Sequence, residues 1–211
     1  MGRRKKEPKS VHRKTIAAAA SRLFQEKGVS ATSMDDIAKE AGYSKATLYV
    51  YFSNKEEIVG LLALESMQKL YHYISSAMEQ ESRTRERYDL ICQGLVKYQE
   101  EFPFYFSMAL EEININFENM EDPEEAETYR VGENINKKIE EFLQDGIKCG
   151  ELRDGLEILP TIFTFWGSIS GLIQLAVNKE IYLKRTMGYS KTQFLAQGFD
   201  LLYRSIDSVK L

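Results

Sequence analysis

Residues 32–58 read TSMDDIAKEAGYSKATLYVYFSNKEEI and contain three helix start signals within one short stretch. Ser33 has an acidic residue, Asp36, three positions later, which is a carboxylate form of the capping box. Gly42 follows where the chain must turn, because glycine adopts the left-handed conformation that ends a helix at little cost. The stretch therefore predicts a short first helix that ends in a tight turn.

A second short helix is predicted directly after this turn. Ser44 is its candidate cap, with Thr47 three residues on, and Leu48 and Phe52 at i and i+4 supply its apolar side. Asn54 begins a third helix with an N-x-x-E capping box. Three helices in this order predict a compact helix-turn-helix unit.

The opposite face of the second helix carries small, hydrogen-bonding and cationic side chains. Such a face can enter a major groove and reach base edges without steric conflict. A helix start beside a lysine is a typical phosphate site. We therefore predict DNA binding, although two-helix turns of this spacing also occur in proteins that bind no nucleic acid. The residues expected at DNA are Lys45, Thr47 and Tyr49 in or near the groove, Ser33, Tyr51 and Lys55 at phosphates, and Ser44 and Ala46 beside them.

Four motifs extend this pattern on both sides: LFQEKG at 23–28, DIAKEAGYS at 36–44, TLYVYF at 47–52 and NKEEI at 54–58. With them, residues 16–58 resemble the tetracycline-repressor (TetR/AcrR) family of bacterial transcription regulators. Tyr51 departs from the histidine that is frequent there, and Tyr43 stands where a small aliphatic residue is common. The resemblance implies an all-α repressor that binds a palindromic operator as a homodimer and is released by a small apolar or aromatic effector.

Positive charge is concentrated at the amino-terminal end although the whole chain is acidic. The 211 residues carry 28 Lys and Arg against 32 Asp and Glu, a net charge of -4. Residues 1–60 hold 12 basic and 7 acidic side chains, whereas residues 61–211 hold 16 and 25. Counterion release then favours phosphate contact by the basic part alone. The run RRKK at 3–6 is either a flexible arm that adds DNA contacts or a solubilising tail.

Length and composition are those of a soluble globular protein with one or two domains. Only 4 prolines and 13 glycines interrupt the chain, so long helices are plausible. No apolar stretch follows the amino-terminal charges, so no signal peptide is expected and the predicted location is cytoplasmic. Cys92 and Cys149 stand outside any C-x-x-C spacing and are expected to be reduced thiols.

Apolar spacing predicts about nine helices. The family resemblance implies that they divide into a helix-turn-helix domain over residues 1–60 and a helical effector-binding and dimerisation domain over 61–211. Beyond the two short helices, the expected helices are 11–27, 55–79, 84–101, 104–117, one that follows an acidic loop at 121–125 and ends at Gly150, 156–179 and 190–209.

Residues 158–178 contain no charge, and 21 residues are long enough to span a bilayer. Interspersed polar side chains make a soluble explanation simpler, in which one side of the helix packs on its own core and the other on a partner subunit. We predict a two-fold dimer built as a four-helix bundle with the last helix, which the family resemblance also implies. The residues expected at this interface are Gly167, Gly171, Ile173, Leu195, Phe199, Leu202 and Ile206.

Aromatic and soft side chains gather in two parts of the predicted body. With Glu111 and Glu112 nearby, they suit an apolar cation through cation–π attraction. The plainer alternative is that they form the core, and that another apolar compound is the effector. The residues expected at the ligand are Tyr98, Phe102, Tyr105, Phe106, Met108, Phe163 and Trp166. No cofactor is expected.

Other function classes have little support in the sequence. His12 and His72 are the only histidines, the paired carboxylates are adjacent in sequence, and no phosphate-binding glycine loop is present, so we predict no enzyme and no metal site. A DNA-binding redox or metal sensor that uses Cys92, Cys149 and His72 stays open as an alternative. Isolated cysteines at core-facing positions are, however, usually just buried.

Overall fold

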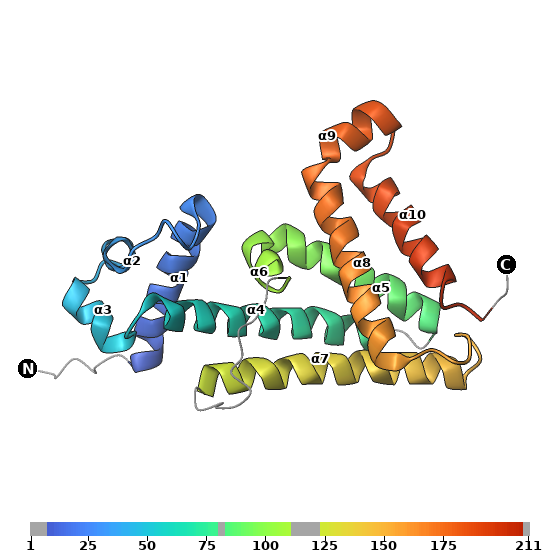
Figure 1. Cartoon of the computed structure of the whole chain (residues 1–211), viewed down its shortest axis with the longest axis horizontal. Coiled ribbons are helices and arrows are strands. Elements are labelled where there is room, and N and C mark those ends of the chain that lie inside the picture. The colour runs from blue at the N-terminus through green and yellow to red at the C-terminus, as the bar shows by residue number, and fades with distance from the viewer. Residues whose placement is uncertain (1–7, 80–82, 111–122, 209–211) are drawn as a thin grey trace, which may run out of the picture.

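A computed structural model describes residues 8–79, 83–110 and 123–208 of the chain (Figure 1). Over these residues the regular structure is helical, and one isolated antiparallel bridge joins Leu152 to Asp207. The all-α prediction is confirmed. The helices are α1 Lys9–Lys27, α2 Met34–Ala41, α3 Lys45–Tyr51, α4 Lys55–Met78, α5 Thr84–Glu101, α6 Pro103–Met108, α7 Pro123–Lys148, α8 Ile158–Asn178, α9 Glu180–Tyr182 and α10 Lys191–Arg204, with a π-helical turn at Leu183–Met187.

The helix starts predicted at Ser33, Ser44 and Asn54 are confirmed by their caps. The hydroxyls of Ser33 and Ser44 and the side-chain oxygen of Asn54 each accept a hydrogen bond from the backbone amide three residues later. Gly42 ends α2 with φ 75° and ψ 24°, in the left-handed region where a side chain is costly. Each cap satisfies amides that the helix leaves without a partner, so α2 and α3 are stable in spite of their shortness.

Two separate clusters of buried side chains form the interior. The first, which we call the reader core, lies among α1 to α3 and the start of α4, and includes Ile16, Ile37, Leu48 and Phe52, all at most 1% exposed. The second, the body core, lies among α4, α5, α7, α8 and α10. Helix α4 contributes to both cores. The helices α1 to α3, which we call the reader, are therefore held by one continuous helix on the body, which comprises the rest of α4 and the helices that follow it.

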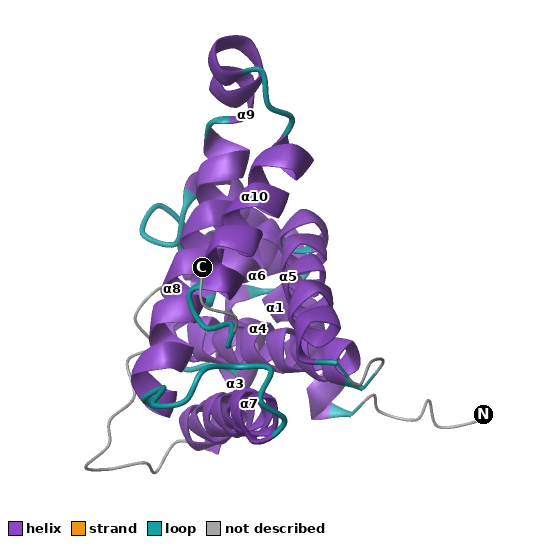
Figure 2. Cartoon of the chain, turned by 90° about the vertical axis from the view of Figure 1, so that its right-hand side faces the viewer, coloured by secondary structure: helices purple, strands orange, loops and turns teal. Residues whose placement is uncertain are grey.

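The body is built around α4 and α7, which pack along one another (Figure 1). Helix α5 packs on α4, and α8 and α10 stand away from the long axis as a helical pair that Figure 2 shows from the side. The last residues return to the α7–α8 loop, where the Arg153 amide donates to the Ile206 carbonyl over 2.9 Å. This contact fixes the base of the α8–α10 pair.

Some predicted helix limits are wrong. The helix expected over 104–117 has only α6 in the described residues, because Pro103 starts it and the chain turns at 109–110. Helix α9 and the π-helical turn were not predicted, since residues 180–187 lack a clear apolar stripe. The final helix ends at Arg204, because the chain then turns to pair with Leu152. Residues 3–6 and both Glu111 and Glu112 lie outside the described part.

Candidate DNA-binding surface and effector cavities

Helix α3 is anchored on one side and open on the other. Leu48 is 0% exposed in the reader core, and Phe52, just after the helix, is 1% exposed. On the opposite side Tyr49 is 46% and Val50 68% exposed. The sequence interpretation missed Val50, although its position two residues after Leu48 points away from the core. The open side thus combines an aromatic, an apolar and a cationic group.

Lys45 lies exposed at the start of α3 and pairs with Asp35 of α2. The ammonium lies 2.7 Å from the carboxylate, and the hydrogen bond to Asp35 raises the pKa of Lys45. Exposed pairs of this kind contribute little to stability. The pair therefore orients Lys45 without preventing its ammonium from moving to DNA.

Lys55 has a structural role that sequence reasoning did not find. Its ammonium donates to the carbonyls of Val29 and Thr32 at 2.8 and 3.0 Å, which fixes the loop between α1 and α2 to the start of α4. Because these partners are more than twenty residues away, no local pattern signals them. Two of its three donors are therefore already used, and a phosphate contact by Lys55 stays a prediction.

The two departures from the family pattern, Tyr43 and Tyr51, lie together around His12 of α1. The His12 ring Nδ1 is 2.7 Å from the Tyr43 hydroxyl, and the same ring stacks on Tyr51 with 5.0 Å between centroids. The centroids of the two tyrosines are 6.3 Å apart. The aromatic cluster secures the turn before α3 and the end of α3 to α1.

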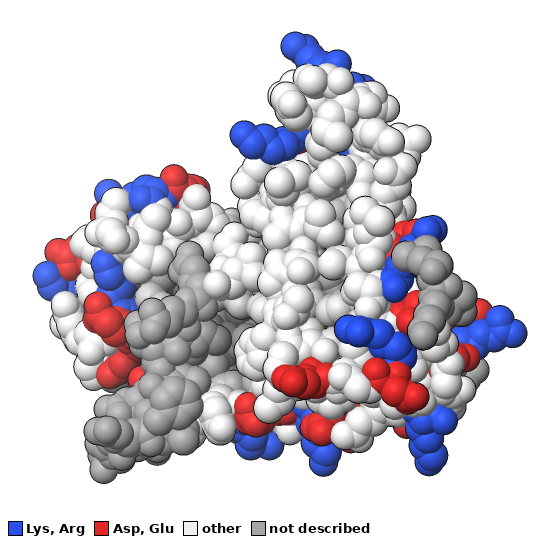
Figure 3. All heavy atoms as spheres, turned by 45° about the vertical axis from the view of Figure 1, so that its right-hand side comes forward, with Lys and Arg blue, Asp and Glu red and all other residues white. Residues whose placement is uncertain are grey.

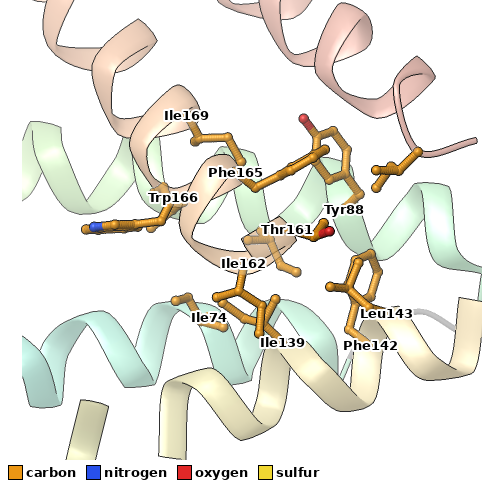
Figure 4. Close-up of a pocket in the computed structure, with 13 residues that line it drawn as sticks. Ile74, Tyr88, Ile139, Phe142, Leu143, Thr161, Ile162, Phe165, Trp166 and Ile169 are labelled. Atoms are coloured by element: carbon orange, nitrogen blue, oxygen red, sulfur yellow. The ribbon is translucent and has the colours of Figure 1, made fainter. Parts of the chain in front are cut away.

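A narrow apolar cavity lies in the body core between α4, α5, α7 and α8 (Figure 4). Its volume is about 50 Å³, and none of the described residues that line it is charged. Figure 4 shows Ile74 of α4, Ile139 of α7 and Ile162 of α8 gathered at its floor. The lining residues are Ile74, Tyr88, Ile91, Leu95, Ile139, Phe142, Leu143, Thr161, Ile162, Phe165, Trp166, Ile169 and Ile206.

A wider cavity of about 210 Å³ adjoins the narrow one and shares Ile139, Ile162 and Trp166 with it. It extends between α4, α7 and α8 toward the end of α6, and Asn136 is its one polar lining side chain among the described residues. The two cavities therefore share a wall, of which Trp166 is part.

The seven residues expected at a ligand separate into three groups. Phe163 and Trp166 line the wider cavity. Tyr98 and Phe106 are 0% exposed in the body core, where the Tyr98 hydroxyl donates to the Ser66 carbonyl over 3.1 Å and burial raises the pKa of Tyr98 to about 12.

The remaining three, Phe102, Tyr105 and Met108, line neither of these two cavities. Tyr105 and Met108 instead pack against the reader core, and the Tyr105 hydroxyl donates to Glu65 over 2.8 Å. Because Tyr105 packs against both cores, α6 joins the reader to the body, a role that helical spacing alone does not distinguish from ligand binding.

The residues expected at a dimer interface also face different ways. Ile173, Leu195, Phe199 and Ile206 are at most 8% exposed and pack inside the body core, and Leu202 packs against them. Gly167 and Gly171 lie on the outer face of α8 with open space beside them. The outer face is a stripe at four-residue steps, Leu159, Phe163, Gly167, Gly171 and Leu175, whose three large side chains are 45% to 61% exposed.

Helix α8 is long and apolar enough to cross a membrane by length and composition, and only 22% of its most apolar window is buried. Such a helix is weak evidence for a membrane span. Figure 3 shows few charged side chains over the upright α8–α10 pair, in contrast to the charged surface around α7. Helix α8 thus exposes an apolar face in this part of the chain.

The two cysteines lie in different environments. Cys92 is 1% exposed, and burial raises the pKa of its thiol to about 12, which disfavours the reactive thiolate. Cys149 is exposed, so the expectation that both are buried is wrong for it. The described residues contain no group of three or more His, Cys, Asp or Glu placed to hold a metal ion.

A capped three-helix reader with one open helix face, joined by a long helix to an all-helical body, defines a helix-turn-helix regulator. The family profile described as "Bacterial regulatory proteins, tetR family" matches residues 16–62. The HTH-type transcriptional regulator TtgR of Pseudomonas putida is 38% identical over 81 residues, a stretch that spans only 38% of either chain. Residues 16–62 are therefore similar to the amino-terminal domain of the tetR family, and the relatives that the chain matches are named as regulators, not enzymes.

Two further similarities extend over most of the chain. The Fatty acid metabolism regulator protein of Bacillus subtilis is 23% identical over 191 residues, which cover 87% of this chain and 93% of that protein. The structure of the transcriptional regulator FadR from Bacillus subtilis in complex with stearoyl-CoA has a TM-score of 0.69 at 20% identity, and covers 90% of this chain and 97% of that one. At this identity the structural similarity establishes the fold.

Proposed function

We propose that this protein is a cytoplasmic transcriptional repressor that binds a palindromic operator as a homodimer and leaves it when an apolar effector binds. The observation that carries the proposal is the open face of α3, opposite the buried Leu48. A helix held by its core side and exposed on the other can insert into a major groove. We place the division between DNA-binding and effector domains near residue 60, within α4.

The chemistry of the open face suits base reading. Lys45 provides a cation for guanine edges or phosphates, the Tyr49 hydroxyl provides a donor, and Val50 provides an apolar surface for a thymine methyl group. Ala46 is small enough to let the backbone approach. The Ser44 hydroxyl lies 2.8 Å from that of Thr47 and caps the helix start, so both hold the face in place as well as bordering the DNA.

Dimerisation is supported by the stripe on the outer face of α8. Two glycines at its centre, Gly167 and Gly171, have nothing within 4 Å of an added Cβ, and they allow the helices of two copies to approach closely. On α10, Leu201 is 69% exposed and offers a further apolar side chain. We propose that these residues, together with Leu202, contact the partner, while Ile173, Leu195, Phe199 and Ile206 support them from inside.

The effector class follows from the lining of the cavities. Among the described residues, the linings include the polar side chains of Thr161 and Asn136 but no charged one. An ionised group is costly in a site without a charged partner, so the part of the ligand that enters must be uncharged and mainly apolar. This argues against a buried cationic effector. A fatty acyl chain fits this chemistry, and the structural neighbour in complex with stearoyl-CoA supports it.

The size of the narrow cavity suggests how binding would affect DNA. Sites for drug-sized ligands have volumes of about 300–1,000 Å³, so an effector must separate α7 and α8 from α4 and α5. Because α4 carries the reader, the same movement changes the distance between the two α3 helices of a dimer. Recognition helices must lie about 34–36 Å apart to enter successive grooves, so an effector that prefers the widened state releases DNA.

Selection of bound sequences from random duplex DNA tests this proposal, with light scattering to determine the mass of the free protein. We expect a palindrome and a dimer. The lack of any preferred duplex over competitor DNA at moderate salt would overturn the DNA-binding proposal, and a monomer at micromolar concentration would overturn the α8 interface.

A further inference from the structure

Arg13 of α1 joins three separate elements through one side chain. Its guanidinium carbon lies 4.1 Å from the centroid of the Phe52 ring, directly after α3. One nitrogen donates to the Tyr51 carbonyl over 2.8 Å, at the last residue of α3. Another is ion-paired with Glu124, in the first turn of α7. The side chains of Arg13 and Glu124 are 21% and 26% exposed, so the pair is largely shielded from water.

The contact with Tyr51 satisfies a carbonyl that the end of a helix leaves without an internal partner. The planar guanidinium can stack on a ring and donate to two acceptors at the same time, whereas an ammonium cannot reproduce that geometry. Glu124 is therefore the third anchor that keeps the guanidinium turned toward the end of α3.

Helix α7 also forms one wall of both cavities, through Ile139 among others. It has 26 residues and no proline after Pro123, so movement of its middle carries its first turn with it. A displacement of α7 therefore moves Glu124 relative to α1, by a path that does not pass through α4.

We propose that Arg13 is a positioning residue that ties the end of α3 to the first turn of α7, so that the position of α7 sets operator affinity. The inference rests on the DNA binding proposed above. It differs from a direct DNA contact, in which Arg13 acts only as a positive charge near phosphates.

Glu124→Gln is the decisive substitution, because charge and geometry predict opposite effects. Removal of a negative charge should strengthen DNA binding if only charge matters. The loss of the third anchor should instead weaken operator binding by about tenfold, comparable to one charged hydrogen bond. Glu127→Gln is the matched control: it lies one turn further along α7, pairs with Arg130 of the same helix, and has a similarly exposed side chain, 32%. It should leave affinity unchanged.

Arg13→Lys separates the two roles of the arginine. It retains the charge, so a phosphate contact would survive, but a positioning role would be lost. We expect weaker operator binding with an unchanged salt slope, whereas loss of a phosphate contact would reduce that slope by about 0.9. The proposal would be overturned if Arg13→Lys bound the operator as tightly as the unaltered protein. Equal effects of Glu124→Gln and Glu127→Gln on operator affinity would also overturn it, as would unchanged or tighter operator binding by Glu124→Gln.

A second measurement does not depend on DNA. The Phe52 amide donates to the Leu48 carbonyl over 3.1 Å at the end of α3, so its hydrogen exchange reports whether that end is held. Faster exchange in Glu124→Gln than in Glu127→Gln supports the tie, and equal exchange contradicts it. If the unaltered protein prefers no duplex, the proposed function fails, while this exchange result still decides the role of Arg13.

Discussion

Substitution of two serine caps, one at the start of α3 and one at the start of α10, distinguishes an effect on stability from an effect on DNA binding. Ser44 accepts the Thr47 amide at the start of α3, and Ser190 accepts the Gln193 amide at the start of α10, each over 3.1 Å. Ser44→Ala and Ser190→Ala should each lower the free energy of unfolding by about 1 kcal/mol. Only Ser44→Ala should also weaken operator binding, as measured by urea unfolding and titration of labelled duplex. Equal DNA affinity of the two variants would contradict a role for the α3 start.

The Asp36 carboxylate gives the reader a defined response to acid. Its hydrogen bonds with the Ser33 backbone, and then with Lys27, hold the pKa of Asp36 well below its usual value of 3.8. A lowered pKa stabilises the folded state above the unfolded value, and that contribution is lost as the pH falls through the folded pKa. Asp36→Asn should therefore reduce stability at pH 7, and the difference from the unaltered protein should shrink below pH about 4. A difference that stays constant between pH 7 and 3.5 in urea titrations would refute this.

The thiols provide a test of the redox alternative. Because Cys92 is buried with a raised pKa and Cys149 is exposed, a thiol reagent should label one cysteine per native chain and two after denaturation. Mass spectrometry identifies the labelled site, and Cys149→Ser serves as the control that should abolish native labelling. Rapid labelling of Cys92 in the native protein would reopen the sensor hypothesis.

At the scale of the helix, the outer face of α8 determines the proposed assembly. Leu175 is 45% exposed at the end of the stripe, and Val11, on α1, is 42% exposed. Leu175→Glu places a charge in the proposed interface and should convert the dimer to a monomer, whereas Val11→Glu should not. Light scattering at micromolar concentration measures both, and a dimer that persists in Leu175→Glu places the interface elsewhere.

The helices themselves were largely predictable because their signals are local. The caps at Ser33, Ser44 and Asn54 depend on contacts three residues apart, and the prolines and glycines that end helices act through their own backbone. Helix α6 and the π-helical turn were mispredicted, since their limits depend on how the chain packs against α4, α5 and α10.

For the whole molecule, a larger side chain in the cavity wall can fill the proposed effector site. Ile139 lines both cavities, so Ile139→Trp should occupy the space that a ligand needs, at a cost of about 1–3 kcal/mol in stability. We expect this variant to keep operator binding but to lose the rise in melting temperature that a long-chain acyl compound gives the unaltered protein. Ile139→Val, which enlarges the space, should keep that rise. An undiminished rise in Ile139→Trp would place the ligand elsewhere.

The candidate sites were predictable to different degrees. Lys45 and Tyr49 lie on the open face of α3 as expected, because a helix with a defined core side has a defined opposite side. The roles of Lys55 and Arg13 were not predictable, since each contacts elements more than twenty residues away. The spacing of residues within one helix does not predict such long-range contacts.

Local signals were enough to predict the helices of this chain, the position of the reader and the concentration of positive charge there, because caps, turns and apolar periods act over a few residues. Long-range packing was needed to show which side of α8 is exposed and which aromatic residues line the cavities. Both sides of α8 are apolar, so periodicity cannot orient it. Its orientation is set by packing against α5, α7 and α10, whose contacts form only when distant parts of the chain come together.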